Sequence, residues 1–292
     1  MKKPLVAFFS TLIVWCFIVL PESARADSKF SLRLQGGWAY LSAGDVNPGT
    51  QAFFNHYEAL WPASTDGYRA VHKGYEFGGD VIFELTPRLG VGIGGGYLQI
   101  SRASSMLLYD PELISPYASV AAEPRMNAVP VRMSVYLTVP LSTKFNFHAD
   151  VGASYYFRAH YSDECRRIIW TMDEPSSVTY INNHVEKKGI PIGFQGGVGI
   201  EYELHHNFFV YLDARGRYAR FRGLKGTSVL EIDDETFSEQ GILYYESVPM
   251  LLGSPRLIMV QSDPPDGPGG EPRQAVVDFS GVSLQFGIRI RL

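Results

Sequence analysis

The chain is poor in cysteine, in long apolar runs and in surplus positive charge, and each shortage excludes a class of protein. It has two cysteines in 292 residues, and Cys16 lies in a predicted leader. Only Cys165 then remains, so a small secreted fold held by intrachain disulfides is excluded. No apolar run of about 18 residues follows residue 26, which argues against a transmembrane helix. The net charge is −4, and an acidic chain binds nucleic acid poorly.

Residues 1–26 are predicted to be a secretory signal peptide rather than part of the fold. Lys2 and Lys3 give a positive start, Leu5–Leu20 is mostly apolar, and Ala24-Arg25-Ala26 is a small-x-small cleavage site. Three basic residues and one acidic residue leave with this segment. The predicted mature chain, residues 27–292, is treated as one domain with a net charge of −6. For a secreted chain we expect neither a cytosolic nor a nuclear role.

The chain is rich in glycine and aromatic residues, and apolar and polar residues alternate along it. Aromatic residues make up 13% of the sequence and glycine occurs 29 times, which favours β-structure over disorder. Apolar and polar residues alternate with a period of two, as in strands that have two different faces. Eight segments have this pattern: Phe30–Leu41, Gly74–Leu85, Leu89–Ile100, Val129–Val139, Phe145–Arg158, Ile190–Leu204, Phe208–Phe221 and Val282–Leu292.

The two stripes of these segments differ sharply in charge. In Phe30–Leu41, every second residue from Phe30 to Tyr40 is apolar or glycine, while Arg33 and Gln35 lie on the opposite stripe. The last segment repeats the pattern, with Arg289 and Arg291 opposite its apolar stripe. Over all eight segments the polar stripes hold seven acidic and six basic residues: Arg33, Glu76, Asp80, Glu84, Arg132, Asp150, Glu201, Glu203, Asp213, Arg215, Arg217, Arg289 and Arg291.

Soluble sandwiches also alternate, so three further features decide what the apolar stripes contact. The connections alternate between short (Thr86–Arg88, Pro140–Lys144, His205–Asn207) and long (Ser42–Lys73, Ser101–Ala128, Ala159–Gly189, Arg222–Gly281). Eight is an even number, so both ends of the chain lie on the side of the short turns. Aromatic residues gather near both strand ends, as in interfacial girdles: Trp38, Tyr40, Tyr75, Tyr97, Tyr155 and Tyr218 at the loop end, and Phe30, Phe83, Phe145, Tyr202 and Phe208 at the turn end.

These features predict an all-β fold, a closed antiparallel transmembrane barrel of eight strands with long outer loops and short periplasmic turns. Lipid offers no hydrogen-bond partner to the backbone, so a sheet inside a bilayer has to close on itself. Eight strands leave an interior that side chains can just fill. Seven acidic and six basic residues in so narrow a space predict an interior charge network that plugs the barrel, rather than an open pore.

The last long connection leaves the strand number open between eight and ten. It contains three further strand-like runs, Ser228–Ile232, Ile242–Val248 and Arg256–Gln261. We favour hairpins that extend the barrel above the membrane, with Asp263–Gly270 as an exposed tip. The alternative places Ile242–Leu251 and Arg256–Gln261 in the membrane as two more strands. The loop is acidic, which suits either a solvated surface or divalent cations that bridge it to lipopolysaccharide.

At this point the chain resembles the small eight-stranded bacterial outer-membrane barrels, such as the transmembrane domain of OmpA, OmpX and OmpW. The most specific match is the C-terminal run Gln285-Phe286-Gly287-Ile288-Arg289-Ile290-Arg291-Leu292. It is similar to the signal by which the barrel assembly machinery recognises a last strand, with Gln285, Gly287, Ile290 and Leu292 at the signal positions. Leu292 departs from the usual final Phe. The resemblance implies location in the bacterial outer membrane and contact with lipopolysaccharide.

Two motifs have both a structural and a functional interpretation. Gly90-Val91-Gly92-Ile93-Gly94-Gly95 satisfies G-x-G-x-x-G, the pattern of a dinucleotide-binding turn between a strand and a helix. Here it lies inside a predicted strand, so we interpret its glycines as space for large side chains such as Tyr136 or Arg132. His148, Asp150 and Ser154 share one inward face, and neighbouring barrels with lipid-A-modifying activity also use His and Ser. Ser154 is three residue pairs from His148, out of direct reach. A satisfied polar network is the better interpretation.

No residue pattern predicts a metal or cofactor site. His205-His206 falls in a short turn without a supporting cluster, and Cys165 falls in a predicted long loop, as either a free thiol or an intermolecular link. We therefore expect a non-enzymatic integral outer-membrane protein with a plugged lumen. Its surface loops would serve envelope structure, adhesion or recognition. The alternatives are a narrow channel for small or hydrophobic solutes and a lipid-A-modifying hydrolase.

Overall fold

The structure is a computed structural model, and the part of the chain that it describes starts at residue 29. The described ranges are 29–61, 63–109, 116–171, 174–233, 235–247, 255–264 and 273–292. The predicted signal peptide lies outside these ranges. So does most of the predicted loop tip Asp263–Gly270.

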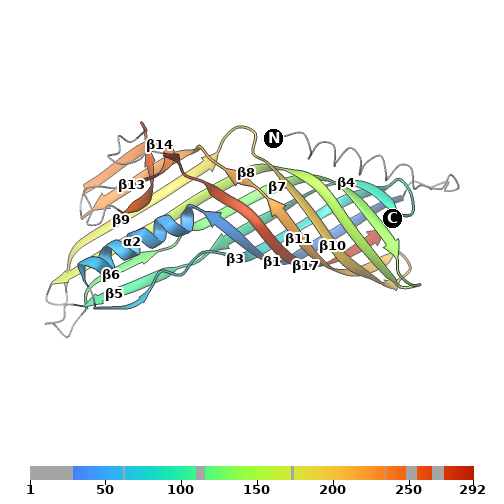
Figure 1. The fold of residues 1–292 in the computed structure, drawn as a ribbon, viewed down its shortest axis with the longest axis horizontal. Coiled ribbons are helices and arrows are strands. Elements are labelled where there is room, and N and C mark those ends of the chain that lie inside the picture. The colour runs from blue at the N-terminus through green and yellow to red at the C-terminus, as the bar shows by residue number, and fades with distance from the viewer. Residues whose placement is uncertain are drawn as a thin grey trace, which may run out of the picture.

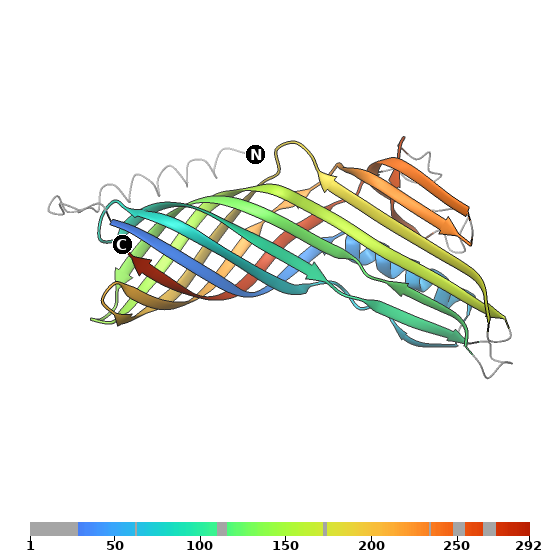
Figure 2. The same cartoon turned by 180° about the vertical axis from the view of Figure 1, so that it is seen from behind.

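Eight long strands form a closed antiparallel ring (Figures 1 and 2). Each strand pairs with its neighbours in the order given below, and the last pairs with the first through Ser31↔Arg291 to Gly44↔Val277. The predicted eight-stranded barrel is therefore confirmed. Its strands are β1 (Lys29–Gly44), β3 (Lys73–Glu84), β4 (Leu89–Ser101), β7 (Arg125–Pro140), β8 (Phe145–Thr171), β10 (Ile192–His205), β11 (Phe208–Tyr218) and β17 (Val277–Arg291).

One end of the barrel has short connections and holds both ends of the ring. The turns β3–β4, β7–β8 and β10–β11 lie here, together with the C-terminus (Figure 2). The backbone N–H of Leu292 donates to the carbonyl oxygen of Phe30 at 2.7 Å, which ties the end of the last strand to the start of the first. We call this the turn end. Its arrangement is the one that an even number of strands predicts.

The apolar stripes face outward along the wall of the barrel. Trp38 is 76% exposed and Met133 is 71% exposed, and all six predicted loop-end aromatic residues are exposed. In water such a surface would be an extended apolar patch, which soluble monomers avoid. The outward stripes are therefore lipid-facing, as the alternation predicts.

The opposite end of the barrel continues into a folded extension, which we call the head (Figure 1). Strand β8 has 27 residues, about 90 Å at roughly 3.3 Å per residue, whereas the lipid-facing band of such barrels is only about 25 Å tall. The rest of the head is built on β8 and its neighbours. Its other strands are β2 (Ala63–Gly67), β5 (Ser104–Tyr109), β6 (Pro116–Ala122), β9 (Glu174–Lys187), β12 (Arg220–Phe221), β13 (Leu224–Ile232), β14 (Glu235–Ser247), β15 (Arg256–Gln261) and β16 (Arg273–Gln274).

The ten-strand alternative is wrong. Strand β14 pairs with β13, β15 and β16, and β15 pairs with β14, all within the head. The ring closes without them, because β11 pairs directly with β17. These strands extend the wall above the membrane as hairpins, which is the arrangement that we favoured.

A helix that the alternation did not reveal lies across the inner side of the head. Helix α2 (Val46–Leu60) rests in the trough formed by the head strands (Figure 1). Val46, Thr50 and Phe54 are buried at a helical spacing of four residues. Asp45 precedes the helix but does not cap it with its side chain. Its carboxylate instead binds Arg273 at 2.5 and 2.7 Å, which ties the start of α2 to β16.

A bulge in β8 explains why the alternation stops at the top of the barrel. Opposite Ala128–Pro130 of β7, β8 carries one extra residue, so Tyr156 and Ala159 both face inward while Phe157 and Arg158 are exposed. Such a bulge changes which residues face the interior. Above it, Tyr161, Asp163 and Cys165 form the inner face of the head.

Two adjacent glycines of β4 test which residues of this strand face the crowded interior of the barrel. A Cβ on Gly94 would lie 1.9 Å from Oδ1 of Asp80 and 2.4 Å from the carbonyl oxygen of Gly79, whereas a Cβ on Gly95 would have its nearest contact at 3.7 Å. We expect Gly94→Ala to lose most of the folded, heat-modifiable band from outer membranes. Gly95→Ala is the matched control and should fold like the parent. Equal amounts of folded barrel from both variants would contradict the inward position of Gly94.

Candidate functional site: the filled barrel interior

Most of the charged residues of the polar stripes lie buried inside the barrel. Ten of the thirteen are buried, and five are acidic while five are basic: Glu76, Asp80, Asp150, Glu201, Asp213, Arg33, Arg132, Arg215, Arg217 and Arg289. We call this set the interior charge network. The equal numbers matter because an unpaired buried charge is strongly unfavourable.

Arg132 of β7 joins the two carboxylates of β3. Its Nε and Nη2 donate to Asp80 at 2.6 and 3.1 Å, a bidentate pair of the kind that guanidinium geometry favours. Its Nη1 lies 3.9 Å from Glu76. Glu76 also accepts from Arg217 of β11, which in addition donates to Ser283 of β17 at 2.9 Å. This group therefore links four of the eight strands across the barrel.

A second group of buried charges centres on β11 and β8. Arg215 donates to Asp150 at 3.1 Å and to Asp213 at 3.2 Å. The side chains of these three residues are fully buried. His148 adds to the group, with ring nitrogens 3.4 Å from Asp213 and 3.8 Å from Glu201. Arg33 of β1 lies 3.1 Å from the same histidine ring.

Aromatic rings lie against two buried arginines, Arg33 and Arg289. The guanidinium carbon of Arg33 lies 4.1 Å from the ring centre of Tyr211 and 5.6 Å from that of Tyr136. Arg289 lies 4.6 Å from the ring of Phe209 and 2.8 Å from Glu201. A desolvated cation over an aromatic face gains about 2 kcal/mol. These ring contacts therefore add to the ion pairs in stabilising the two buried guanidinium groups.

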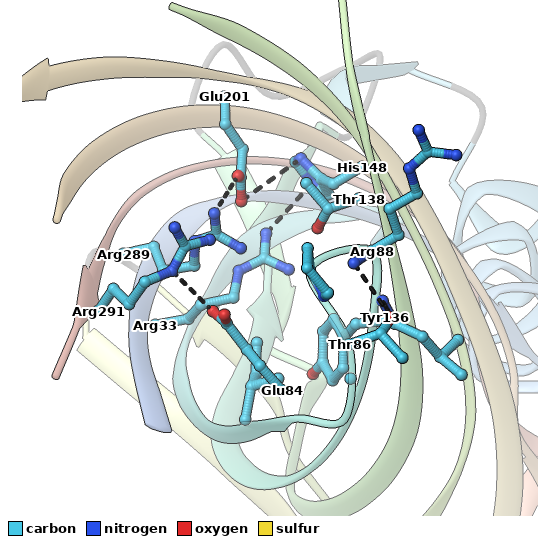
Figure 3. Close-up of a pocket in the computed structure, with 14 residues that line it drawn as sticks. Arg33, Glu84, Thr86, Arg88, Tyr136, Thr138, His148, Glu201, Arg289 and Arg291 are labelled. Carbon is cyan, nitrogen blue, oxygen red and sulfur yellow. Dashed lines mark hydrogen bonds and ion pairs between the residues drawn. The ribbon is translucent and has the colours of Figure 1, made fainter. Parts of the chain in front are cut away.

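A small pocket opens from the network at the turn end (Figure 3). It has a volume of about 20 Å³, room for roughly one water molecule. In Figure 3 the side chains of Arg33, Arg289 and Glu201 point into it, and Arg291 pairs with Glu84 at its rim at 3.0 Å. The pocket is too small for an organic solute. It marks where the packed interior ends.

Three predicted members of the network lie at its edge or outside it. Glu84 and Arg291 pair with each other but are partly exposed at the turn end. Glu203 was predicted to belong to the network but does not: within the described ranges it forms no ion pair, and it is only half-buried. It precedes the register shift between Glu203 and His205, where β10 runs into its turn. The alternation continues in sequence to this point, but the enclosed interior does not.

The glycine-rich motif lies inside β4, as predicted, and makes room for large side chains. A Cβ on Gly92 would lie 2.9 Å from the ring of Tyr136, and one on Gly96 would lie 3.7 Å from Arg132. A dinucleotide site needs a strand, the glycine turn and then a helix. Here the glycines are part of a continuous strand.

The three residues of the hydrolase alternative do not form a catalytic arrangement. Asp150 pairs with Arg215 rather than with His148. The hydroxyl of Ser154 is buried and has no hydrogen-bond partner among the described residues, and His148 contacts Arg33, Asp213 and Glu201 instead. A nucleophile needs a base within hydrogen-bond reach. His148 therefore lies among the buried charges, as the predicted inward face and polar network suggest.

Above the network the interior becomes apolar. Leu41, Leu98, Ile100, Met126 and Tyr156 belong to a buried cluster that continues into the head. The expected position of Cys165 in a long loop is wrong, because it lies in β8, in a second cluster around Phe54 of α2. It is a free thiol that is 7% exposed. Burial raises the pKa of this thiol well above its usual value, which opposes a link to another chain.

The histidine pair lies at the turn end of the barrel. His205 is the last residue of β10, His206 follows in the turn to β11, and both are exposed. The described residues include no group of three or more ligands suited to a metal ion. Among the same residues, no helix is long and apolar enough to cross a membrane.

Comparison with known proteins agrees with this architecture. The profile of the family described as outer membrane protein beta-barrel domain matches residues 10–238, and the chain belongs to this family. It is a protein of the bacterial outer membrane. A search of curated proteins gave no match.

Three solved structures have a low similarity to this chain. A major outer membrane protein from Thermus thermophilus has 16% sequence identity and a TM-score of 0.38, over 91% of this chain and 100% of the other. The outer membrane protease OmpT from Escherichia coli has 9% identity and a TM-score of 0.39, over 93% and 99%. The attachment invasion locus protein Ail of Yersinia pestis has 10% identity and a TM-score of 0.26, over 91% and 97%.

Arg132 tests whether the network stabilises the barrel. Arg132→Met leaves Asp80 buried without an ion pair, so we expect a loss of about 3–5 kcal/mol in the free energy of unfolding. Urea titration of the protein refolded in lipid vesicles measures this loss. The control, Arg125→Met, removes an exposed pair with Glu123 and should cost less than about 1 kcal/mol. The double variant Arg132→Met/Asp80→Leu should recover part of the loss. A single-variant loss no larger than that of the control would contradict the network's role.

Proposed function

We propose that this protein is a non-enzymatic, non-conducting outer-membrane barrel that holds a rigid head outside the cell for recognition or adhesion. One observation carries the non-conducting part: the charged side chains at the centre of the barrel are almost completely inaccessible. Arg215, Asp150 and Asp213 have fully buried side chains. A side chain that lines an open water-filled pore would be exposed to that water.

The channel alternative is less well supported. The interior charge network spans the barrel, and the apolar cluster around Leu98 and Tyr156 lies above it and continues into the head. A solute would have to displace both layers. Breaking several buried ion pairs without replacement costs several kcal/mol each, so passage through this interior would be rare.

The recognition part of the proposal is supported by the construction of the head. Its strands continue those of the barrel, and α2 packs inside it through Phe54 and its neighbours. Recognition sites are commonly carried by segments that a rigid scaffold positions. A head of this kind presents a folded surface rather than a set of separate loops.

The absence of enzymatic activity is likewise a proposal. It is supported by the positions of His148 and Ser154, which do not contact each other inside the barrel. A lipid substrate would also have to enter the packed interior to reach His148. The lipid-A hydrolase remains the alternative that a direct assay can eliminate.

We further propose that the C-terminal strand is read by the barrel assembly machinery and that the wall contacts lipopolysaccharide. Gln285, Gly287, Ile290 and Leu292 carry the proposed assembly signal. Gly287 also has a structural reason, because a Cβ there would lie 2.3 Å from the carbonyl oxygen of Leu34. The signal can therefore be tested cleanly at Leu292, whose side chain is 74% exposed.

Conductance in planar bilayers tests the plug. We expect the purified, heat-modifiable protein to give no resolved openings, because the packed network leaves no water-filled path. A general-diffusion porin reconstituted in the same way is the positive control, and sedimentation of the proteoliposomes checks that the protein has inserted. Reproducible open states of the inserted protein would contradict the plug and favour the channel.

Mass spectrometry of lipid A tests the hydrolase alternative. Expression in a heterologous host should leave the acyl-chain pattern unchanged, because His148 is engaged with carboxylates and Arg33. The parent and a His148→Ala variant should give the same spectrum. Loss or transfer of an acyl chain with the parent only would contradict the non-enzymatic proposal.

A further inference from the structure

A cavity of about 70 Å³ lies inside the head, away from the barrel interior. Helix α2 and strand β15 lie on one side of it, and β8, β9 and β13 form the other. Its polar lining comes from Asp163 and Asn183 with the hydroxyl-bearing Thr50 and Ser228, while Phe53 contributes to its apolar wall. Cys165 also lines the cavity. Five separate elements therefore contribute to one cavity.

The polar groups around this cavity are mainly hydrogen-bond acceptors. Asp163 accepts from the hydroxyl of Tyr161 at 2.7 Å and from the backbone N–H of Asn183 at 3.2 Å, which are both neutral donors. Oδ1 of Asn183, a residue that is 3% exposed, has no partner within the described ranges. The hydroxyl of Thr50 donates to the carbonyl oxygen of Val46, which leaves its own oxygen free to accept.

No positive charge balances the carboxylate of Asp163. Among the described residues no Lys, Arg or His forms an ion pair with it, unlike the buried acids of the interior charge network. Burial raises its pKa to about 6, and the hydrogen bonds from Tyr161 and Asn183 oppose this shift. A cation that reaches a buried carboxylate stabilises its ionised form.

We propose that the head cavity binds a primary ammonium group on a short alkyl chain. An ammonium has three N–H donors and no acceptor, which matches Asp163, Asn183 and a hydroxyl oxygen. The volume suits an ammonium with two or three carbons, since a water molecule occupies about 30 Å³. The apolar wall around Phe53 would cover the methylene groups. The inference rests on the proposed recognition function of the head and names its ligand class.

Two sources could supply this group, a free small amine and the side chain of a lysine. Both present the same ammonium and differ in what is attached beyond the first carbons. Ethylammonium stands for the free amine, and Nα-acetyl-lysine amide stands for the side chain. Comparing the two probes distinguishes the sources.

Cys165 provides a built-in reporter, because it is the only cysteine of the described residues and it lines the cavity. Methanethiosulfonate reagents transfer a thioalkyl group to its thiolate, forming a disulfide and releasing methanesulfinate. Reagents with an ammonium, a sulfonate or only a methyl group differ in charge. The folded protein in detergent is treated with each, and mass spectrometry follows modification. A simple thiol in solution gives the reference ratio of cationic to anionic rates.

We expect the cationic reagent to exceed the anionic one at Cys165 by at least tenfold more than in the reference. Asp163→Asn should return the ratio to the reference. Glu164→Gln is the matched control, because it removes the same charge from the next residue of β8, which is exposed. It should keep the selectivity. A reference ratio in the parent overturns the proposal, and so does selectivity that survives Asp163→Asn or disappears equally in both variants.

Competition in the parent keeps the test decisive if Asp163→Asn does not fold. Ethylammonium should slow the neutral methyl reagent at Cys165 in a saturable way, while 1-propanol, a neutral molecule of similar size, should not. Protection by Nα-acetyl-lysine amide as well extends the site to lysine side chains. Protection by neither amine overturns the proposal. That result would leave the conductance test of the plug unaffected, so the two failures are distinguishable.

Discussion

The whole molecule depends on the need to pair every backbone N–H and C=O within lipid. A sheet meets that need only by closing, so β17 has to pair with β1. Closure with eight strands sets a narrow interior, and the narrow interior in turn dictates what fills it. The alternating stripes, the inward glycines and the equal numbers of buried acids and bases are all consequences of this one requirement.

The barrel could be predicted from the sequence because period-two alternation reports it directly. Each residue of a lipid-spanning strand faces either hydrocarbon or the interior, and a shift of one residue would bury the wrong stripe. The head could be predicted only in part. The runs that form β13, β14 and β15 were expected as hairpins, whereas β2, β5, β6, β9 and the extension of β8 were not predicted. The bulge at Phe157 and Arg158 reverses the inward face of β8, so the alternating pattern ends there. Helix α2 carries its apolar residues at a spacing of about four, a signal that a search for strands overlooks.

The interior site was predictable in composition but not in pairing. The alternation identifies which charged residues point inward, whereas strand tilt and register decide that Asp80 meets Arg132 while Glu203 meets no partner among the described residues. The inward face of His148 was predicted, but its contacts with Arg33 and Asp213 depend on register and could not be. The head cavity could not be predicted from the sequence. Its lining spans Gly49 to Met259 in the sequence, and only the folded arrangement of five elements brings those residues together.

The unbroken course of β8 from the turn end to Thr171 has a mechanical consequence. A single hydrogen-bonded strand, flanked on both sides for most of its length, joins the two halves of the molecule without a hinge. The head is therefore joined to the barrel by continuous strand pairing, and separating the two would require breaking the hydrogen bonds of β8 with its neighbours. The described part of the head is thus a continuation of the barrel wall rather than a domain on a flexible linker.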